Sequence, residues 1–99
     1  MRITVTSRHV EATPTVVAYA HEKAAKVEHL LEGILSVSVT LDVGRRGHAG
    51  QTAEFIARVP KGGTFVSHSR GTSLYEAIDL AEGKLLSQLR RVKAKLRRR

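Results

Sequence analysis

Apolar and polar residues alternate in two stretches of the first half of the chain. Between residues 2 and 8, Ile3 and Val5 share one side and polar residues the other. Residues 36–43 alternate more strictly, with apolar side chains at every odd position. A side-chain period of two is typical of a strand with one buried face. Both stretches are therefore predicted to be half-buried strands.

Two further strands are expected after residue 50, beyond a glycine-rich loop at 44–50. Ala53, Phe55 and Ala57 alternate with residues of the opposite face. Pro60-Lys-Gly-Gly63 has the composition of a turn, and residues 64–70 can return beside the preceding strand. This segment is predicted to be a hairpin.

A helix is predicted to begin at Thr13-Pro14, with the Thr13 hydroxyl as N-cap and Pro14 in the first helical position. Apolar residues then recur at three- and four-residue spacing, at Val16, Val17, Ala20, Ala24, Val27 and Leu31. Gly33 is suited to the position that ends a helix.

A second helix is predicted to begin at Ser73, because Ser73 and Glu76 have the spacing of a capping box. Its apolar stripe is Ile78, Ala81, Leu85, Leu89, Val92 and Leu96. Since the stretch has no proline and many good helix formers, the helix is expected to continue well into the basic C-terminus.

These elements occur in the order β-α-β-β-β-α. We expect one α+β domain over residues 1–99, a two-layer sandwich with a four-stranded sheet and both helices packed on one face. If the first two strands pair in parallel, the helix between them makes a right-handed crossover.

Charge is concentrated at the C-terminal end. The chain has 17 Lys and Arg against nine Asp and Glu, a formal net charge of +8. Residues 1–79 contain nine basic and eight acidic groups, whereas residues 80–99 contain eight basic groups and one acid, Glu82. A domain with this asymmetry is typical of a protein that binds a polyanion.

The basic residues of the second helix fall on two flanks of its apolar stripe. At 100° per residue, one flank has Lys84, Arg91, Lys95 and Arg98, and the other has Arg90, Lys93 and Arg97. On the first helix, Lys23 and Lys26 add charge to a flank expected to be exposed. Solvation and the helix macrodipole account for two or three of the eight basic residues at 80–99, but not for all eight.

Nucleic acid is favoured over a membrane surface, because the apolar stripe of the second helix is needed for the core of so short a chain. No apolar run approaches the roughly 18 residues of a bilayer span, and the alternating start is not a signal peptide. Without Cys, disulfides and thiolate sites are excluded. We expect a cytoplasmic protein.

No catalytic, metal or cofactor site is predicted. Gly44-Arg-Arg-Gly47 matches the backbone clamp of a KH domain, but here it joins two strands, and a hairpin tip is the better interpretation. The five histidines lack an i, i+4 pair on a helix and any Cys partner. We therefore expect no enzyme and no small-molecule substrate.

Several segments together resemble the ribosome hibernation-promoting factors, a family that includes the inhibitor protein Y. Ser73-Leu-Tyr-Glu-Ala-Ile-Asp79 is similar to the family's Asp-Met-Tyr-x-Ala-Ile-Asp signature. The other matching segments are Val10-Glu11-x-Thr13, Lys23-x-x-Lys26, Lys84-Leu85, Gln88-Leu89 and Lys93-x-Lys95-Leu96. The resemblance covers essentially the whole chain.

This resemblance implies a factor that silences translation in idle ribosomes without any chemistry. It would occupy the decoding channel of the small ribosomal subunit and exclude messenger and transfer RNA. The residues that match the family's basic positions, and would contact ribosomal RNA, are Lys23, Lys26, Lys84, Arg90, Arg91, Lys93 and Lys95; Arg97 is added from its basic character alone.

The chain resembles the short hibernation-promoting type, which implies a ribosome modulation factor as a further partner in pairing ribosomes. It differs from the family pattern at Ser73, where Asp is usual, and at Ser67 and Ser69, where alanines are usual. A general double-stranded RNA-binding module is the alternative, because a sheet with a basic helix also suits that class.

Overall fold

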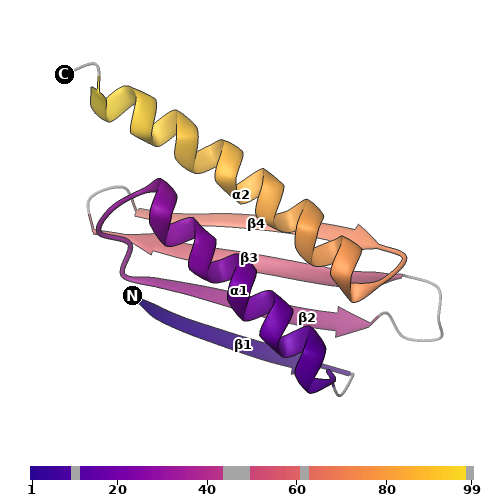
Figure 1. Ribbon diagram of the computed structural model, residues 1–99. Coiled ribbons are helices and arrows are strands. Elements are labelled where there is room, and N and C mark those ends of the chain that lie inside the picture. The colour runs from indigo at the N-terminus through magenta and orange to yellow at the C-terminus, as the bar shows by residue number, and fades with distance from the viewer. Residues whose placement is uncertain (10–11, 44–49, 61–62, 98–99) are drawn as a thin grey trace.

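Four strands form one sheet in the order β1-β2-β3-β4 (Figure 1). The computed structural model describes residues 1–9, 12–43, 50–60 and 63–97. Of residues 96 and 97 it describes the backbone alone. The elements are β1 (Arg2–Arg8), α1 (Pro14–Leu30), β2 (Ser36–Val43), β3 (Gln51–Val59), β4 (Gly63–Gly71) and α2 (Leu74–Arg97). β1 pairs with β2 in parallel, and the other pairs are antiparallel.

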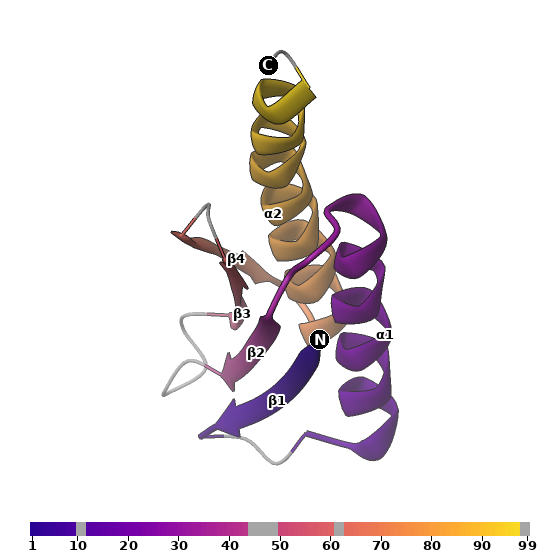
Figure 2. The same cartoon turned by 90° about the vertical axis from the view of Figure 1, so that its left-hand side faces the viewer.

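Both helices cover the same face of the sheet, and no helix or strand of the described residues covers the other, which we call the open face (Figure 2). α1 packs on β1 and β2, whereas α2 packs on β3 and β4 and also contacts α1. The predicted α+β sandwich and its element order are thus confirmed. The parallel pairing predicted conditionally for the first two strands is also present.

The core lies between the two layers. Its largest fully buried side chains are Phe55, Leu41, Ile78, Leu85, Leu89, Val27, Val37 and Val39. They come from β2, β3 and both helices, at positions that the periodicity assigned to buried faces. Val17 is an exception: its side chain is 36% exposed, so its inclusion in the apolar stripe of α1 was wrong. Its neighbour Val16 takes the buried place.

The helix ends differ in detail from the prediction. Thr13 caps α1 as expected, because its Oγ1 accepts a hydrogen bond from the Val16 N–H at 3.3 Å. At the other end, Leu31 is the C-cap, and Gly33 adopts its positive φ of 87° two residues later. Gly33 thus forms the turn toward β2 rather than the helix stop itself.

The capping box of α2 is half formed. The Ser73 hydroxyl accepts from the Glu76 N–H at 3.1 Å, but Glu76 Oε1 accepts from the N–H of Thr72, at 2.8 Å. Gly71 passes close to the same side chain, since a Cβ at Gly71 would lie 2.9 Å from Glu76 Cβ. The carboxylate therefore meets the chain one residue earlier than the motif predicts.

α2 also covers the outer edge of the sheet with polar side chains. As the edge strand, β4 has carbonyls with no strand partner on that side. Lys84 Nζ donates to the carbonyl of His68, and Gln88 Nε2 donates to that of Val66, both at 2.9 Å. These bonds fix α2 along β4 and leave that edge less available for pairing.

Leu85 is fully buried where α2 crosses the sheet, whereas Leu80 on the same helix is 48% exposed. We expect Leu85→Ala to lower the free energy of unfolding by about 2–5 kcal/mol, because it leaves a cavity in the core. Leu80→Ala, the matched control, should change it by under about 0.5 kcal/mol. Chemical denaturation measures both. Equal, small losses would mean that α2 is not docked as described.

Candidate nucleic-acid interface

α2 is longer than the surface it packs against. Among the described side chains of the helix, which end at Lys95, Leu89 is the last that is fully buried, and Val92 is only partly buried against the core. Beyond that point the helix projects past the sheet (Figures 1 and 2). The predicted apolar stripe is therefore confirmed up to Leu89, and Val92 is buried only in part. The last predicted member, Leu96, has its side chain outside the described part. We call residues 90–97 the basic end of α2.

The basic end of α2 presents uncompensated positive charge. Its described basic side chains are those of Arg90, Arg91, Lys93 and Lys95, and Arg97 has only its backbone described. Lys93 is half-buried and the other three are exposed. Among the described residues, none of the four forms a salt bridge. Cations at a helix C-terminus are favoured by the macrodipole, which offsets part of their mutual repulsion.

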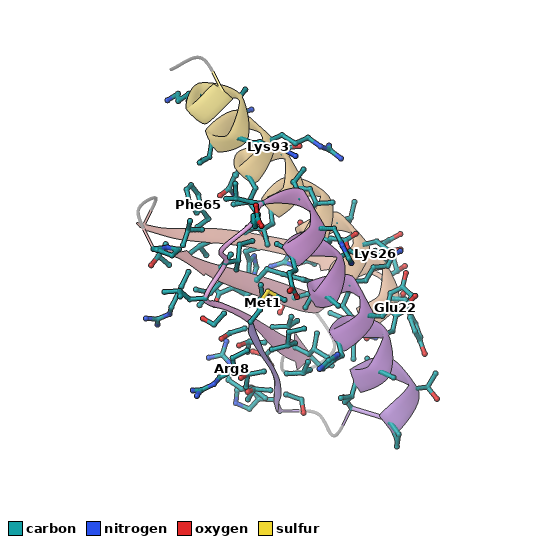
Figure 3. The ribbon with its side chains drawn as sticks, turned by 60° about the vertical axis from the view of Figure 1, so that its left-hand side comes forward. Met1, Arg8, Glu22, Lys26, Phe65 and Lys93 are labelled. Atoms are coloured by element: carbon teal, nitrogen blue, oxygen red, sulfur yellow. The ribbon has the colours of Figure 1, made fainter. Side chains whose placement is uncertain are left out.

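A shallow cavity of about 260 Å³ adjoins one flank of the basic end of α2. Arg91 and Lys95 line it together with Phe65 of β4, and Gln88 and Val92 complete it. The placement of Arg91 and Lys95 on one flank agrees with the helical-wheel prediction. Phe65 was not singled out in the sequence, because its period-two strand pattern gives no sign that α2 passes beside it. Figure 3 shows Phe65 below the projecting helix that carries Lys93.

Lys84 is exposed to solvent and also forms a hydrogen bond within the protein. Its ammonium donates to the His68 carbonyl, so it is tethered to β4. An ammonium has three donors, and two of them remain for an external ligand. Lys84 therefore stays a candidate contact residue, but with a fixed position beside the sheet.

Lys23 does not lie on an exposed flank, and that prediction was wrong. Its side chain is 20% exposed, and its Nζ lies 3.7 Å from Asp79 Oδ1 on α2. The same ammonium lies 5.2 Å from the centre of the Tyr19 ring, whose hydroxyl donates to Asp79. Tyr75 packs edge-on against Tyr19 with 5.0 Å between ring centres. Lys23 is thus part of the contact between the helices.

Burial and charge act in opposite directions on Lys23. Desolvation by itself lowers the pKa of its ammonium, but the carboxylates of Glu82 and Asp79, with Tyr19, raise it by more. The pKa of the Tyr19 hydroxyl is raised in turn, chiefly by its hydrogen bond to Asp79. Lys23 therefore stays protonated while it holds the two helices together.

Glu82, the one acid of the C-terminal twenty residues, is directed inward. It is 8% exposed, and its Oε2 has no hydrogen-bond partner among the described residues. Burial raises the pKa of its carboxyl, although the nearby charges of Lys23 and Lys26 lower it in part. Lys26 itself is exposed on α1 (Figure 3). Tyr19 and Lys23 of α1 contact Asp79 of α2, and Lys26, further along α1, lies near Glu82, further along α2. The two helices therefore run in the same direction.

The structure therefore divides the predicted site residues into two groups. Arg90, Arg91, Lys93 and Lys95 gather at the basic end of α2. Lys23, Lys26 and Lys84 lie nearer the core, where each has a charged or hydrogen-bonding neighbour within the protein. The Gly44–Gly47 loop and His48 lie outside the described residues.

Within the described ranges, no helix combines the length and hydrophobicity needed to cross a bilayer. In the same ranges, no three His, Asp or Glu side chains come together in a group that would hold a metal ion. The surface that stands out in this part of the chain is the cationic one.

Comparison with known proteins links this architecture to ribosome-associated factors. The sequence model of the family described as "Sigma 54 modulation protein / S30EA ribosomal protein" matches residues 3–97. A ribosome hibernation promoting factor of Pseudomonas putida is 33% identical over 95 residues, which are 96% of this chain and 89% of that protein. The factor of that name from Escherichia coli K12 is 30% identical, over 98% of each chain.

Solved structures show the same fold. The N-terminal domain of Thermus thermophilus protein Y superposes with a TM-score of 0.79 at 28% identity, over 93% of this chain and 99% of that one. A ribosomal subunit interface protein of Coxiella burnetii gives a TM-score of 0.82 at 20% identity, over 95% and 99% of the two chains. The latter likeness concerns the fold alone.

Glu82 supplies a pH-dependent test of the contact between the helices. The pKa of the Glu82 carboxyl is raised in the folded protein, so folding favours the protonated form. At a pH above the ordinary carboxyl pKa of 4.5, ionisation of Glu82 therefore destabilises the folded protein. We expect Glu82→Gln to stabilise the protein at pH 7 by on the order of 1 kcal/mol, roughly 4–8 °C in Tm. The advantage should shrink as the pH falls toward about 4.

Thermal melts between pH 4 and 8 measure this difference, with Glu22→Gln as the control because Glu22 is exposed on α1. A difference in Tm between Glu82→Gln and the native chain that does not change with pH would contradict the buried placement of Glu82. So would a lower Tm of Glu82→Gln at pH 7.

Proposed function

The chain belongs to the Sigma 54 modulation protein / S30EA ribosomal protein family, and we propose that it silences translation by binding the small ribosomal subunit. In this proposal the folded domain occupies the decoding channel and excludes messenger and transfer RNA from idle ribosomes. Silencing is steric and needs no catalysis. The site of action is then the cytoplasm, where ribosomes are.

The observation that carries the proposal is the basic end of α2. Four basic side chains lie on a projecting helix, none with a salt-bridge partner among the described residues. Phosphate contacts supply most of the affinity of such a surface for nucleic acid, and they position a protein without reading base sequence. A rigid domain with a charged projection is suited to a preformed RNA channel, because shape and charge suffice for recognition there.

Relatives support the hibernation part of the proposal by name. The Pseudomonas and Escherichia proteins are called ribosome hibernation promoting factors, and their alignments extend over nearly the whole of this chain. We propose that this chain likewise acts on idle ribosomes, with ribosomal RNA as its ligand. Pairing of ribosomes together with a ribosome modulation factor is an extension of the same proposal.

Each flank of the basic end of α2 should contribute measurably to subunit binding. We expect Arg91→Gln with Lys95→Gln, and separately Arg90→Gln with Lys93→Gln, to weaken binding to purified small subunits by at least roughly tenfold. The slope of log affinity against log salt should fall by about 1.5 in each case, since each lost phosphate contact removes somewhat under one unit. Sedimentation with subunits across a salt series gives both quantities.

Arg8→Gln with Arg70→Gln is the control, because it removes the same charge from the far side of the sheet. It should weaken binding by less than about threefold. Equal losses in all three variants would indicate a general charge effect and contradict the assignment. Tight binding of the native chain to an arbitrary RNA duplex, with no preference for subunits, would favour the double-stranded RNA-binding alternative.

A further inference from the structure

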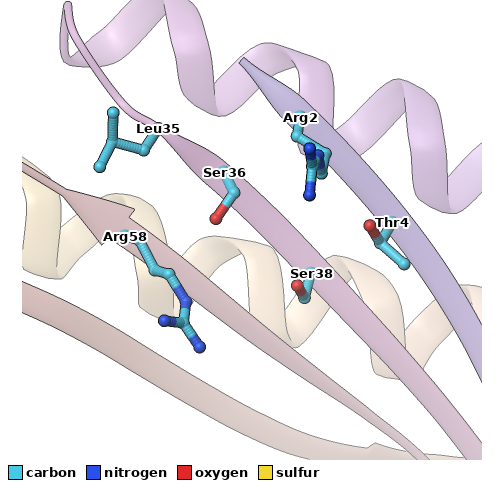
Figure 4. A pocket seen from close by; sticks show the side chains of 6 residues that line it. All are labelled: Arg2, Thr4, Leu35, Ser36, Ser38 and Arg58. Atoms are coloured by element: carbon cyan, nitrogen blue, oxygen red, sulfur yellow. The ribbon is translucent and has the colours of Figure 1, made fainter.

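The open face of the sheet carries a second cationic site, far in the sequence from the basic end of α2. A shallow cavity of about 510 Å³ lies over one end of this face. Its lining residues are Arg2, Thr4, Leu35, Ser36, Ser38 and Arg58 (Figure 4). They come from β1, β2, β3 and the residue that precedes β2. No part of the function proposed above uses them.

Strand register brings the two arginines to the same place. Ser36 of β2 pairs with Arg2 of β1 on one side and with Arg58 of β3 on the other. Neighbouring strands are about 4.8 Å apart, so the two arginines flank one serine across three strands. Figure 4 shows Ser36 between them. The next row on the same face adds the hydroxyls of Thr4 and Ser38, which are also paired.

This arrangement has the chemistry of an anion site. Two guanidiniums supply charge and planar pairs of N–H donors, and three hydroxyls supply further donors. No carboxylate lines the cavity, and neither arginine forms a salt bridge within the described ranges. Two cations held near each other without a counter-charge repel, and a bound anion would relieve that repulsion.

The opposite end of the same face provides an internal comparison. There, Arg8 lies 3.9 Å from Asp42, which also accepts a hydrogen bond from His9 at 3.0 Å. These groups lower the pKa of the Asp42 carboxyl, the hydrogen bond from His9 most of all. At that end the protein provides its own anion. At the Arg2–Arg58 end it provides none among the described residues.

We propose that this cavity binds a backbone phosphate of the ribosomal RNA, so that the domain contacts RNA through both of its layers. The inference rests on the proposed function for the identity of the anion. The domain measures 49 × 22 × 17 Å, so its two faces are close together. A thin domain that enters an RNA-lined channel meets phosphates on both sides, and arginine pairs suit phosphate because they bind it in a bidentate manner.

The test compares Arg2→Gln with Arg58→Gln against the control Arg8→Gln with Arg70→Gln, which removes equal charge from the same face. In the full chain, we expect the first pair to weaken small-subunit binding by roughly tenfold and to lower the salt slope by about one. The control should stay within about threefold of the native chain. Equal effects of the two pairs, or no effect of the first, would overturn the proposal while leaving subunit binding itself intact.

A second measurement uses inorganic phosphate and no ribosome. Titrated into the isotope-labelled chain, phosphate should shift the amide signals of Ser36 and Ser38 and the side-chain Nε–H signals of Arg2 and Arg58 in a saturable way. The Arg2→Gln, Arg58→Gln protein should lose the serine shifts. Shifts spread evenly over all basic residues would overturn the anion site.

The two measurements separate this inference from the function on which it rests. If the native chain fails to bind subunits, the proposed function fails and the RNA assignment with it, and the phosphate titration alone decides whether the anion site exists. If the arginine pair is needed for binding to phosphatidylserine vesicles but not to subunits, the ligand is a lipid headgroup and the RNA assignment is overturned.

Discussion

The burial of one side of α2 against the sheet is the interaction on which the rest of the molecule depends. Leu85 and Leu89 fix the helix to β3 and β4, and Leu89 is the last fully buried side chain among those described, although the helix continues to Arg97. A helix anchored over its first two thirds can hold several like charges on its last third, because those groups remain in water and cost little desolvation. Without that anchor, repulsion among them would favour an unfolded C-terminus.

Acidic groups are arranged to leave the basic end of α2 cationic. Asp79 and Glu82 lie in the docked part of α2, where they face Lys23 and Lys26 of α1. Their charges therefore stabilise Lys23 at the contact between the helices instead of neutralising the projecting arginines. The buried carboxyl of Glu82 carries a cost in stability for this position, since one of its oxygens has no partner in the described part of the chain.

Local patterns predicted the elements well, and failed where a residue's environment depends on how elements pack together. Alternation and capping chemistry identified the strands and helix starts because those signals act over a few residues. Lys23 was misplaced because the rotation of α1 toward α2 is set by the whole core. Likewise, alternation placed Arg2 and Arg58 each on the face opposite the apolar side of its strand, but only the pairing of three strands brings both beside Ser36.

A density map of the chain bound to the small ribosomal subunit would locate the basic end of α2 and the body of the domain on the ribosome. We predict that residues 90–97 lie against ribosomal RNA phosphates, and that the body of the domain overlaps the path of messenger RNA. A map in which this end of the helix points into solvent, or in which the domain lies outside the decoding channel, would show that the chain does not silence translation in the proposed way.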